Sequence, residues 1–186
     1  ESTDNACSSS PRIEIIATVN TTPTITGTTP ATRCDSGTLV LGATGSAGTV
    51  NWYDALTGGA LVGTGTSFTT PSISATTSYF VEVTNAGCTS SPRTLIVATV
   101  NTTPTIIGTT PASRCDAGNL ILGASASAGS INWYDALTGG NLVGSGVSFT
   151  TPIISATTTY FVEATSLGCT SSPRVAVIAT VNTTPT

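Results

Sequence analysis

The sequence contains no histidine, no methionine and no lysine, so all five of its basic residues are arginine. The absence of histidine excludes Ser-His-Asp and Cys-His nucleophile systems and histidine-ligated metal sites. The absence of lysine excludes the Lys–Asn isopeptide cross-links that some pilus domains use. Charged residues make up 8% of the chain, against roughly 25% in an average soluble domain. Solvent-facing positions must therefore be filled mostly by threonine, serine, asparagine and glycine.

Signals for membranes, nucleic acids and metals are also missing. No apolar run approaches the roughly 20 residues that cross a bilayer, and a chain of net charge −4 offers no basic cluster for a phosphate backbone. The cysteines are isolated rather than paired as Cys-x-x-Cys, and there is no Asp-rich calcium loop. The carboxylates Asp35, Asp54 and Glu82 are widely spaced, as in solvated turns. We therefore predict no cofactor, metal site or catalytic residue, no membrane insertion and no nucleic-acid partner.

What the sequence does contain is an internal repeat. The string "ATVN" ends at Asn20, Asn101 and Asn182, and each step is 81 residues long. Residues 21–101 and 102–182 differ at 21 of 81 positions, and many of the differences are small swaps such as Val40 to Ile121. Such swaps preserve the shape of a buried core.

The repeat divides the chain into four parts. We predict that residues 1–20 are the hairpin half and last strand of a preceding repeat, and that 21–101 and 102–182 are two complete repeats. Residues 183–186 match the beginning of a following repeat. We interpret the sequence as a window from a longer tandem array.

Each repeat alternates short apolar segments with turn residues at a spacing of roughly 8–12 residues, the pattern of an all-β domain. No stretch has the periodicity of an amphipathic helix. We predict tandem immunoglobulin-like or fibronectin-like β-sandwich domains of about seven strands each. The strands expected from the clearest patterns in the first repeat are 38–44, 49–55, 60–65, 67–71, 78–83 and 93–100.

The aromatic residues divide into two groups by the alternation of the strands. Four are expected in the cores of the sandwiches: Trp52, Trp133, Tyr79 and Tyr160. Four others are candidates for ligand-facing aromatics: Tyr53, Tyr134, Phe80 and Phe161. The tyrosines are predicted to point outward, where a ring could stack on a sugar.

A set of short motifs is shared with a known family. These are Cys34-x-x-Gly37, Trp52-Tyr53-Asp54 with the following Gly-Gly, a Thr-Thr-x-Tyr run, and Gly-Cys before Ser-Pro-Arg. Together they resemble the Ig-like repeats of large secreted Bacteroidetes cell-surface proteins, including repetitive adhesins and gliding-motility-associated proteins. The resemblance covers both complete repeats and implies an extracellular β-sandwich with a spacer-like or adhesive role. It implies no catalytic residue.

The cysteines suggest disulfides and an oxidising compartment. Three pairings fit the repeat: Cys34–Cys88 with Cys115–Cys169 inside the repeats, Cys34–Cys169 between them, or Cys7–Cys34 with Cys88–Cys115. The first leaves Cys7 without a partner, and it meets a geometric objection. Cys34 precedes the second strand and Cys88 follows the sixth, so a simple sandwich places them at opposite ends, about 20 Å apart, whereas disulfide Cα atoms lie within ~7 Å. The second pairing would staple the junction between repeats.

The segment "VNTTPTITGTTP" between repeats is rich in threonine and proline, which favour extended backbone. We expect a taut linker that limits bending. Each Asn-Thr-Thr triplet matches a glycosylation sequon, but we interpret Asn20, Asn101 and Asn182 as linker residues.

The sequence thus predicts a structural module of an extracellular bacterial stalk or filament that provides mechanical reach. Its expected partners are neighbouring repeats of the same chain or identical subunits in a fibre, and strand addition between subunits is one variant. The alternative is an adhesive module that binds a surface glycan or another ligand through the outward aromatics.

Overall fold

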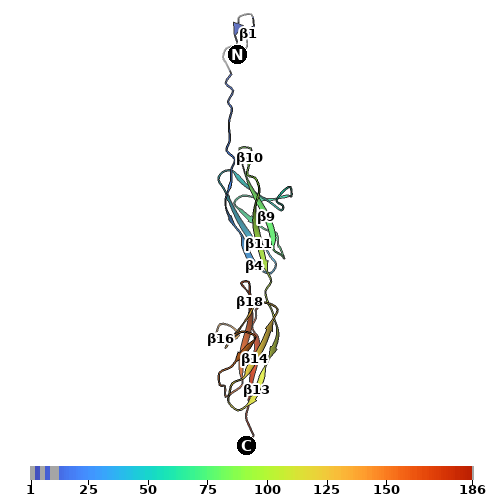
Figure 1. Cartoon of the computed structure of the whole chain (residues 1–186), viewed down its shortest axis with the longest axis vertical. Helices are drawn as coiled ribbons and strands as arrows, with labels where there is room; N and C mark the ends of the chain where they lie inside the picture. The colour runs from blue at the N-terminus through green and yellow to red at the C-terminus, as the bar shows by residue number, and fades with distance from the viewer. Residues whose placement is uncertain (1–2, 5–6, 9–12, 186) are drawn as a thin grey trace.

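The structure, a computed structural model, describes residues 3–4, 7–8 and 13–185. Every regular element within these residues is a β-strand. Figure 1 shows two elongated domains placed end to end, preceded by an extended segment and a small hairpin. The hairpin pairs β1 (Thr3–Asp4) with β2 (Cys7–Ser8). No helix in the described part of the chain is long and apolar enough to cross a membrane.

The first domain is a sandwich of two sheets. One sheet has the order β3-β5-β8, and the other has the order β4-β11-β9-β6-β7, with β10 paired to the end of β9. The strands are β3 (Ile25–Thr29), β4 (Ala31–Cys34), β5 (Val40–Gly45), β6 (Thr49–Tyr53), β7 (Leu61–Thr64), β8 (Ser67–Thr69), β9 (Thr77–Asn85), β10 (Cys88–Thr89) and β11 (Thr94–Asn101). All pairings are antiparallel except that of β4 with β11, which is parallel.

The second domain repeats this architecture strand for strand. Its sheets have the orders β12-β14-β17 and β13-β20-β18-β15-β16, with β19 paired to β18. The strands are β12 (Ile106–Thr110), β13 (Ala112–Cys115), β14 (Ile121–Ala126), β15 (Ser130–Tyr134), β16 (Leu142–Ser145), β17 (Ser148–Thr150), β18 (Thr158–Ser166), β19 (Cys169–Thr170) and β20 (Val175–Asn182). The prediction of tandem all-β sandwiches is confirmed.

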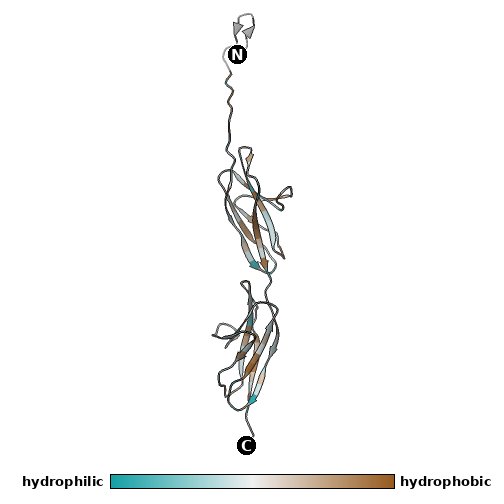
Figure 2. Cartoon of the chain, viewed as in Figure 1, coloured by the Kyte–Doolittle hydropathy of each residue, from teal (hydrophilic) through white to brown (hydrophobic). Residues whose placement is uncertain are grey.

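Each domain has its own hydrophobic core, built from the inward positions of both sheets. Trp52 is completely buried, its ring stacks on Phe68 at 5.2 Å, and its indole N–H donates to the carbonyl of Gly65 at 2.8 Å. Phe68 in turn meets Tyr79 edge to face. Figure 2 shows the hydrophobic stretches on the strands of both domains. The expected core residues Trp52, Trp133, Tyr79 and Tyr160 are all buried.

The linker is shorter than the sequence suggests. Half of the Thr-rich stretch forms a strand, since β12 begins at Ile106 and only residues 102–105 separate it from β11. Pro104 in the middle of this connection is fully buried. Thr105 is fixed to its own domain, because its N–H donates to Ser127 Oγ at 3.0 Å and its carbonyl accepts from Ser127 N–H at 2.9 Å. The connection is therefore part of the packed structure.

Candidate functional site

The most distinctive site is the joint between the two domains. Strand pairing determines the position of Cys34 in this joint. In β4, Cys34 lies directly beside Asn101 because β4 runs parallel to β11 in that register. Cys34 therefore lies at the end of the first domain from which the chain leaves. The next residue, Asp35, turns the chain with a positive φ of 57° while its N–H donates to the carbonyl of Asn101 at 2.8 Å. Aspartate tolerates this left-handed conformation better than most residues.

The second domain contributes a hairpin formed by β18 and β19. Its tip consists of Leu167, which has a positive φ of 49°, and Gly168. The hairpin continues beyond the pairing of β18 with β20, because β19 pairs only with the last two residues of β18. In Figure 1 this end of the second domain faces the end of the first domain where β4 stops. Cys169 follows the tip directly and is buried.

A disulfide joins the two sides. The Sγ atoms of Cys34 and Cys169 are bonded, with their Cα atoms 5.7 Å apart and a sequence separation of 135. The structure thus contains the pairing between repeats. The pairing Cys34–Cys88 within a repeat is wrong, because Cys88 lies next to Asn85 at the far end of β9. The matching pairing Cys115–Cys169 is wrong for the same reason.

The third pairing is also wrong, since Cys34 is already bonded and Cys88 and Cys115 are both free thiols. Cys88 is half-buried and Cys115 is exposed. The side chain of Cys7 lies outside the described residues.

Hydrogen bonds reinforce the disulfide on both sides of the linker. The Asn101 side-chain amide donates to the carbonyl of Leu167 at 2.9 Å, which ties the last strand of one domain to the hairpin of the next. The carboxylate of Asp35 accepts from Thr103 N–H at 3.0 Å and from the Thr103 hydroxyl at 2.6 Å. These two bonds favour the charged carboxylate and hold the pKa of Asp35 below its ordinary value of 3.8.

The same contacts appear at both outer ends of the domain pair. The Asn20 amide donates to the carbonyl of Ala86 at 2.9 Å, and Asp116 accepts from Thr184 as Asp35 does from Thr103. Neither role follows from the sequence patterns described above, which indicate a solvated turn at Asp35 and plain linker residues at the asparagines. The signal was present, since both residue types occur at fixed distances from the cysteines in every repeat.

Cys34 and Asp35 are followed by a glycine that the local packing requires. A Cβ at Gly37 would collide with the guanidinium of Arg33, whose NH1 donates to the carbonyl of Thr38 at 2.8 Å and whose Nε donates to that of Asp35 at 3.1 Å. The Cys-x-x-Gly motif therefore shapes the turn that ends the domain. Gly118 and Arg114 repeat the arrangement.

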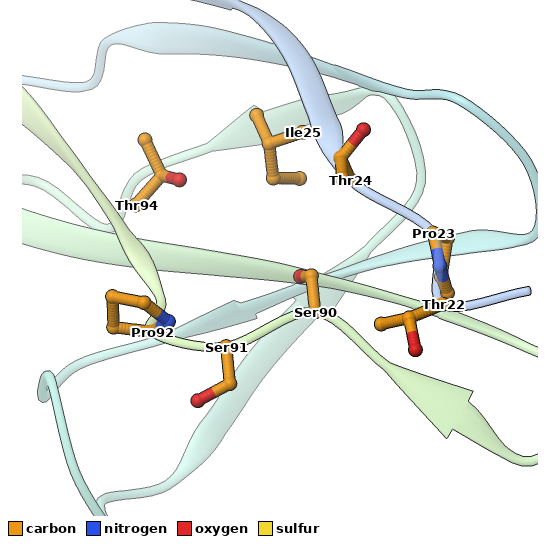
Figure 3. Close-up of a pocket in the computed structure, with 8 residues that line it drawn as sticks. All are labelled: Thr22, Pro23, Thr24, Ile25, Ser90, Ser91, Pro92 and Thr94. Carbon is orange, nitrogen blue, oxygen red and sulfur yellow. The ribbon is translucent and has the colours of Figure 1, made fainter.

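Shallow cavities lie beside the linkers. One of about 400 Å³ is lined by Asp35 from the first domain and by the linker and the Ser-Ser-Pro turn (171–173) of the second. The equivalent cavity of the first domain, about 290 Å³, is shown in Figure 3, where Thr22 and Pro23 of the linker face the turn at Ser90 and Pro92. Hydroxyls and proline rings line these cavities. Among the described residues no group of three or more histidine, cysteine or carboxylate side chains could hold a metal ion.

The outward tyrosines lie away from the joint, and arginine covers one face of each ring. The guanidinium carbon of Arg93 lies 3.4 Å from the ring centroid of Tyr53. Arg93 also pairs with Glu82 at 2.9 Å and donates to the carbonyls of Ala55 and Gly58. A hydrogen bond to Glu82 is the main cause of the raised pKa of Tyr53. Tyr134 has the same environment under Arg174.

These contacts give the tyrosines a structural role, and they make one face of each ring inaccessible to a ligand. Phe80 lies beside Tyr53 on β9, and Phe161 lies beside Tyr134 on β18; all four rings are half-buried. No contact tests a ligand-binding role for them, so that role stays a prediction.

Comparison with known proteins gives a family and a fold. A family model described as "Ig-like domain CHU_C associated" matches residues 21–101 and 102–183. No curated protein matches the chain.

Three solved structures resemble the fold. The Clostridium thermocellum CbhA fibronectin(III)-like modules share 16% identity at a TM-score of 0.51, over 87% of this chain and 94% of that one. Sidekick-1 immunoglobulin domains 1–4 share 16% at a TM-score of 0.53, over 88% and 49%. The titin I-band fragment I67-I69 shares 15% at a TM-score of 0.51, over 89% and 66%. At such identities the likeness concerns the fold alone.

Proposed function

The chain belongs to the family of CHU_C-associated Ig-like domains, and from this membership we propose that it is a mechanical spacer of a bacterial cell-surface stalk or filament. In this role the two sandwiches hold another part of the assembly at a distance from the cell. The role requires no catalysis, and its natural partners are neighbouring repeats or identical subunits.

The joint is the observation that carries the proposal. The four residues of the linker run parallel to a covalent bridge between Cys34 and Cys169, so a pull along the molecule passes through two connections at once. The bonds of Asn101 to Leu167 and of Thr103 to Asp35 fix the direction of the linker. Domains within one chain usually move relative to each other unless their interface is strong. A joint tied in this way suits a stiff spacer better than a flexible hinge.

The chemistry of the chain supports a location outside the cytoplasm. Disulfides persist in oxidising compartments and are rare where thioredoxin and glutathione keep thiols reduced. The chain is also poor in charged residues, which make up 8% of it. We propose an extracellular position, in keeping with the resemblance to secreted surface repeats.

The glycan-binding alternative depends on exposed aromatic rings. Arg93 and Arg174 cover one face of Tyr53 and Tyr134, which leaves at most one face of each ring for a sugar to stack on. We therefore prefer the spacer role.

Small-angle X-ray scattering tests the stiffness that the spacer role needs. The oxidised chain should give the maximum dimension and scattering profile of the end-to-end arrangement, independent of salt. The double variant Cys34→Ser, Cys169→Ser should give a broader distribution of dimensions, while both domains stay folded. An oxidised chain that scatters as an ensemble of bent shapes would contradict the proposal.

Location is tested separately. Antibodies against residues 21–101 should label intact cells of the source organism, and a membrane-impermeant thiol reagent should reach Cys115 on those cells. Labelling that appears only after the cells are broken would rule out a surface role.

A further inference from the structure

The second domain exposes three isoleucines on its three-stranded sheet, β12-β14-β17, and at the end of that sheet. Ile107 is 67% exposed, Ile121 is 65% exposed and Ile153 is 74% exposed. A single exposed apolar side chain is common on protein surfaces and needs no explanation. For a group of three, the first domain provides a reference, because it has the same strand order in both of its sheets.

The first domain is more polar at the same positions. The 81-residue repeat gives the matching residues, which are Thr26 for Ile107, Val40 for Ile121 and Ser72 for Ile153. The Thr26 hydroxyl bonds to the carbonyl and to the hydroxyl of Thr44, both at 3.1 Å. An isoleucine cannot make these bonds. The second domain therefore lacks two hydrogen bonds at this position and has an exposed apolar side chain instead.

Ile121 lies on the outer face of the sheet. It begins β14, the middle strand, which is labelled in Figure 1. Leu122 and Ala124 of this strand are buried in the core, so the alternate residues Ile121, Gly123 and Ser125 face outward. Because the outward residues after Ile121 are small, the face has room for an apolar side chain of another molecule.

Ile107 and Ile153 lie at opposite ends of the same outer face. Ile107 is the extra residue of a β-bulge, and Ile106 before it packs against the core. Ile107 thus points outward, as Thr26 does in the first domain. At the other end Ile154 packs against the core, so Ile153 before it points away from the core. We call the outer surface formed by Ile107, Ile121 and Ile153 the isoleucine face.

The distribution of charge indicates what the isoleucine face can bind. Strands β12, β14 and β17 contain no charged residue. The charged side chains of the second domain lie on its five-stranded sheet or in turns, such as Glu163 on β18 and Arg174 before β20. Because each chain has a net charge of −4, two copies repel each other least where the approaching faces are neutral. The face also lacks the basic and aromatic side chains that bind a lipid surface.

We propose that the isoleucine face is a contact surface between two copies of this chain. Each copy presents the same face, so the contact has twofold symmetry and closes as a dimer. Stable interfaces bury about 800 Å² of each partner, which is more than three isoleucines provide. The dimer is therefore transient, with a dissociation constant in the micromolar to millimolar range. On a surface that carries many spacers it holds neighbouring spacers side by side, a consequence that rests on the proposed function.

Analytical ultracentrifugation of the full oxidised chain tests the contact, with iodoacetamide on the free thiols so that no new disulfide forms. We expect the sedimentation coefficient to rise with protein concentration toward the value of a dimer. Salt should not weaken the association, because no ion pair crosses a neutral face. A chain that stays monomeric at millimolar concentration would overturn the proposal and leave the face to another kind of partner. An association that high salt dissolves would also overturn it.

A matched pair of variants tests which face makes the contact. Ile107→Thr with Ile153→Ser introduces the residues that the first domain carries at these positions, so the second domain should stay folded. We expect the dissociation constant of the dimer to increase at least about tenfold. The control Ile178→Thr changes a 47% exposed isoleucine on the five-stranded sheet and should leave the association unchanged. Unchanged association in the double variant would refute the proposal.

The reverse change gives the first domain an isoleucine face of its own. Thr26→Ile with Ser72→Ile copies the residues of the second domain. A chain with two such faces should associate more strongly, either as a tighter dimer or as larger oligomers. Sedimentation equal to that of the wild type would contradict the proposal. The scattering test of the stiff joint uses dilute, monomeric protein, so the lateral contact and the spacer role can fail separately.

Discussion

On the outer face of each sandwich one arginine side chain makes several contacts at once, and in the first domain this residue is Arg93. Its guanidinium stacks on Tyr53, pairs with Glu82 and bonds two carbonyls of the turn that follows β6. Both partners of the ion pair are about 15% exposed, so water screens the pair only in part. Arg93 thus connects β9, the start of β11 and the turn after β6.

We predict that Arg93→Met destabilises the first domain by about 2 kcal/mol, because it leaves two carbonyls without this donor and removes the counter-charge of a largely buried Glu82, which keeps only its hydrogen bond with Tyr53. Methionine keeps the apolar stem, so packing on Tyr53 is largely preserved. Denaturant unfolding monitored by tryptophan fluorescence measures the change. The control Arg174→Met should shift only the second domain, and equal stability of Arg93→Met and the wild type would contradict the argument.

Asp35 makes the joint sensitive to acid. Its pKa is lowered by the hydrogen bonds from Thr103, so its contribution is fully present above pH 3.8 and is lost as the pH falls through the lower pKa of the folded state. We expect the joint to be unchanged from pH 5 to 8 and to loosen only below about pH 4.

The measurement uses the Cys34→Ser, Cys169→Ser variant, in which hydrogen bonds alone hold the joint. Nuclear magnetic relaxation should show that the tumbling of the two domains is more strongly coupled at pH 6 than near pH 3, although less so than in the disulfide-bonded chain. Asp35→Asn should remove this pH dependence. If the loosening persists unchanged in Asp35→Asn, another group is responsible.

At the scale of elements, most strands of a domain were predictable and the first two, β3 and β4, were not. β6, β9 and β11 alternate buried and exposed side chains, and the expected strands 49–55, 78–83 and 93–100 overlap them. β3 lies within the Thr-rich stretch that was interpreted as linker, and no strand was predicted over β4. Both are edge strands without a fully buried side chain. A strand that buries little has no apolar period to detect. Without β4, the position of Cys34 beside Asn101 could not be derived.

A glycine in β7 links that strand to the core beneath it. A Cβ at Gly63 would lie 2.7 Å from Cδ2 of Phe68, the ring that stacks on Trp52. We predict that Gly63→Ala destabilises the first domain by about 2 kcal/mol, because the ring must leave its packed position.

Thermal and denaturant unfolding test this, with Thr64→Ala on the exposed face of the same strand as the control. That control should change stability by less than about 0.5 kcal/mol. Gly144→Ala, next to Phe149, should reproduce the effect in the second domain. If Gly63→Ala is as stable as Thr64→Ala, the contact between a Cβ at position 63 and the Phe68 ring does not destabilise the domain.

At the scale of the whole molecule, the disulfide changes the path that a force takes. A pull between the two ends of the chain crosses the joint through the linker and through the bridge from Cys34 to Cys169. Because the bridge is covalent, the 135-residue segment that it closes cannot be drawn out to its full length even when the domains unfold. Of the two sandwiches, only β3, β4 and β20 lie wholly outside that loop. Both cores are thereby largely protected from extension.

We predict that single-molecule stretching releases about 470 Å less length from the oxidised chain than from the reduced one, at roughly 3.5 Å for each of the 135 residues. Cys34→Ser should behave like the reduced chain under all conditions. Equal released lengths with and without reductant would contradict the bypass.

The 81-residue period was sufficient to predict two similar domains in tandem, because a repeat of that length can bury its own core. It did not determine the cysteine pairing, which depends on how the end of one domain meets the start of the next. That contact involves residues far apart in sequence, such as Asn101 and Leu167, and strand patterns within a repeat do not report it.

The bridge between Cys34 and Cys169 also alters what a protease can do to this molecule. In a simple string of domains, one cut in the backbone separates everything beyond it. Here a single cut at any bond between those cysteines, including those after Arg93 and Arg114, leaves two fragments that remain covalently attached. A single cut over most of the chain therefore opens the loop between the two cysteines but does not separate the two ends of the molecule.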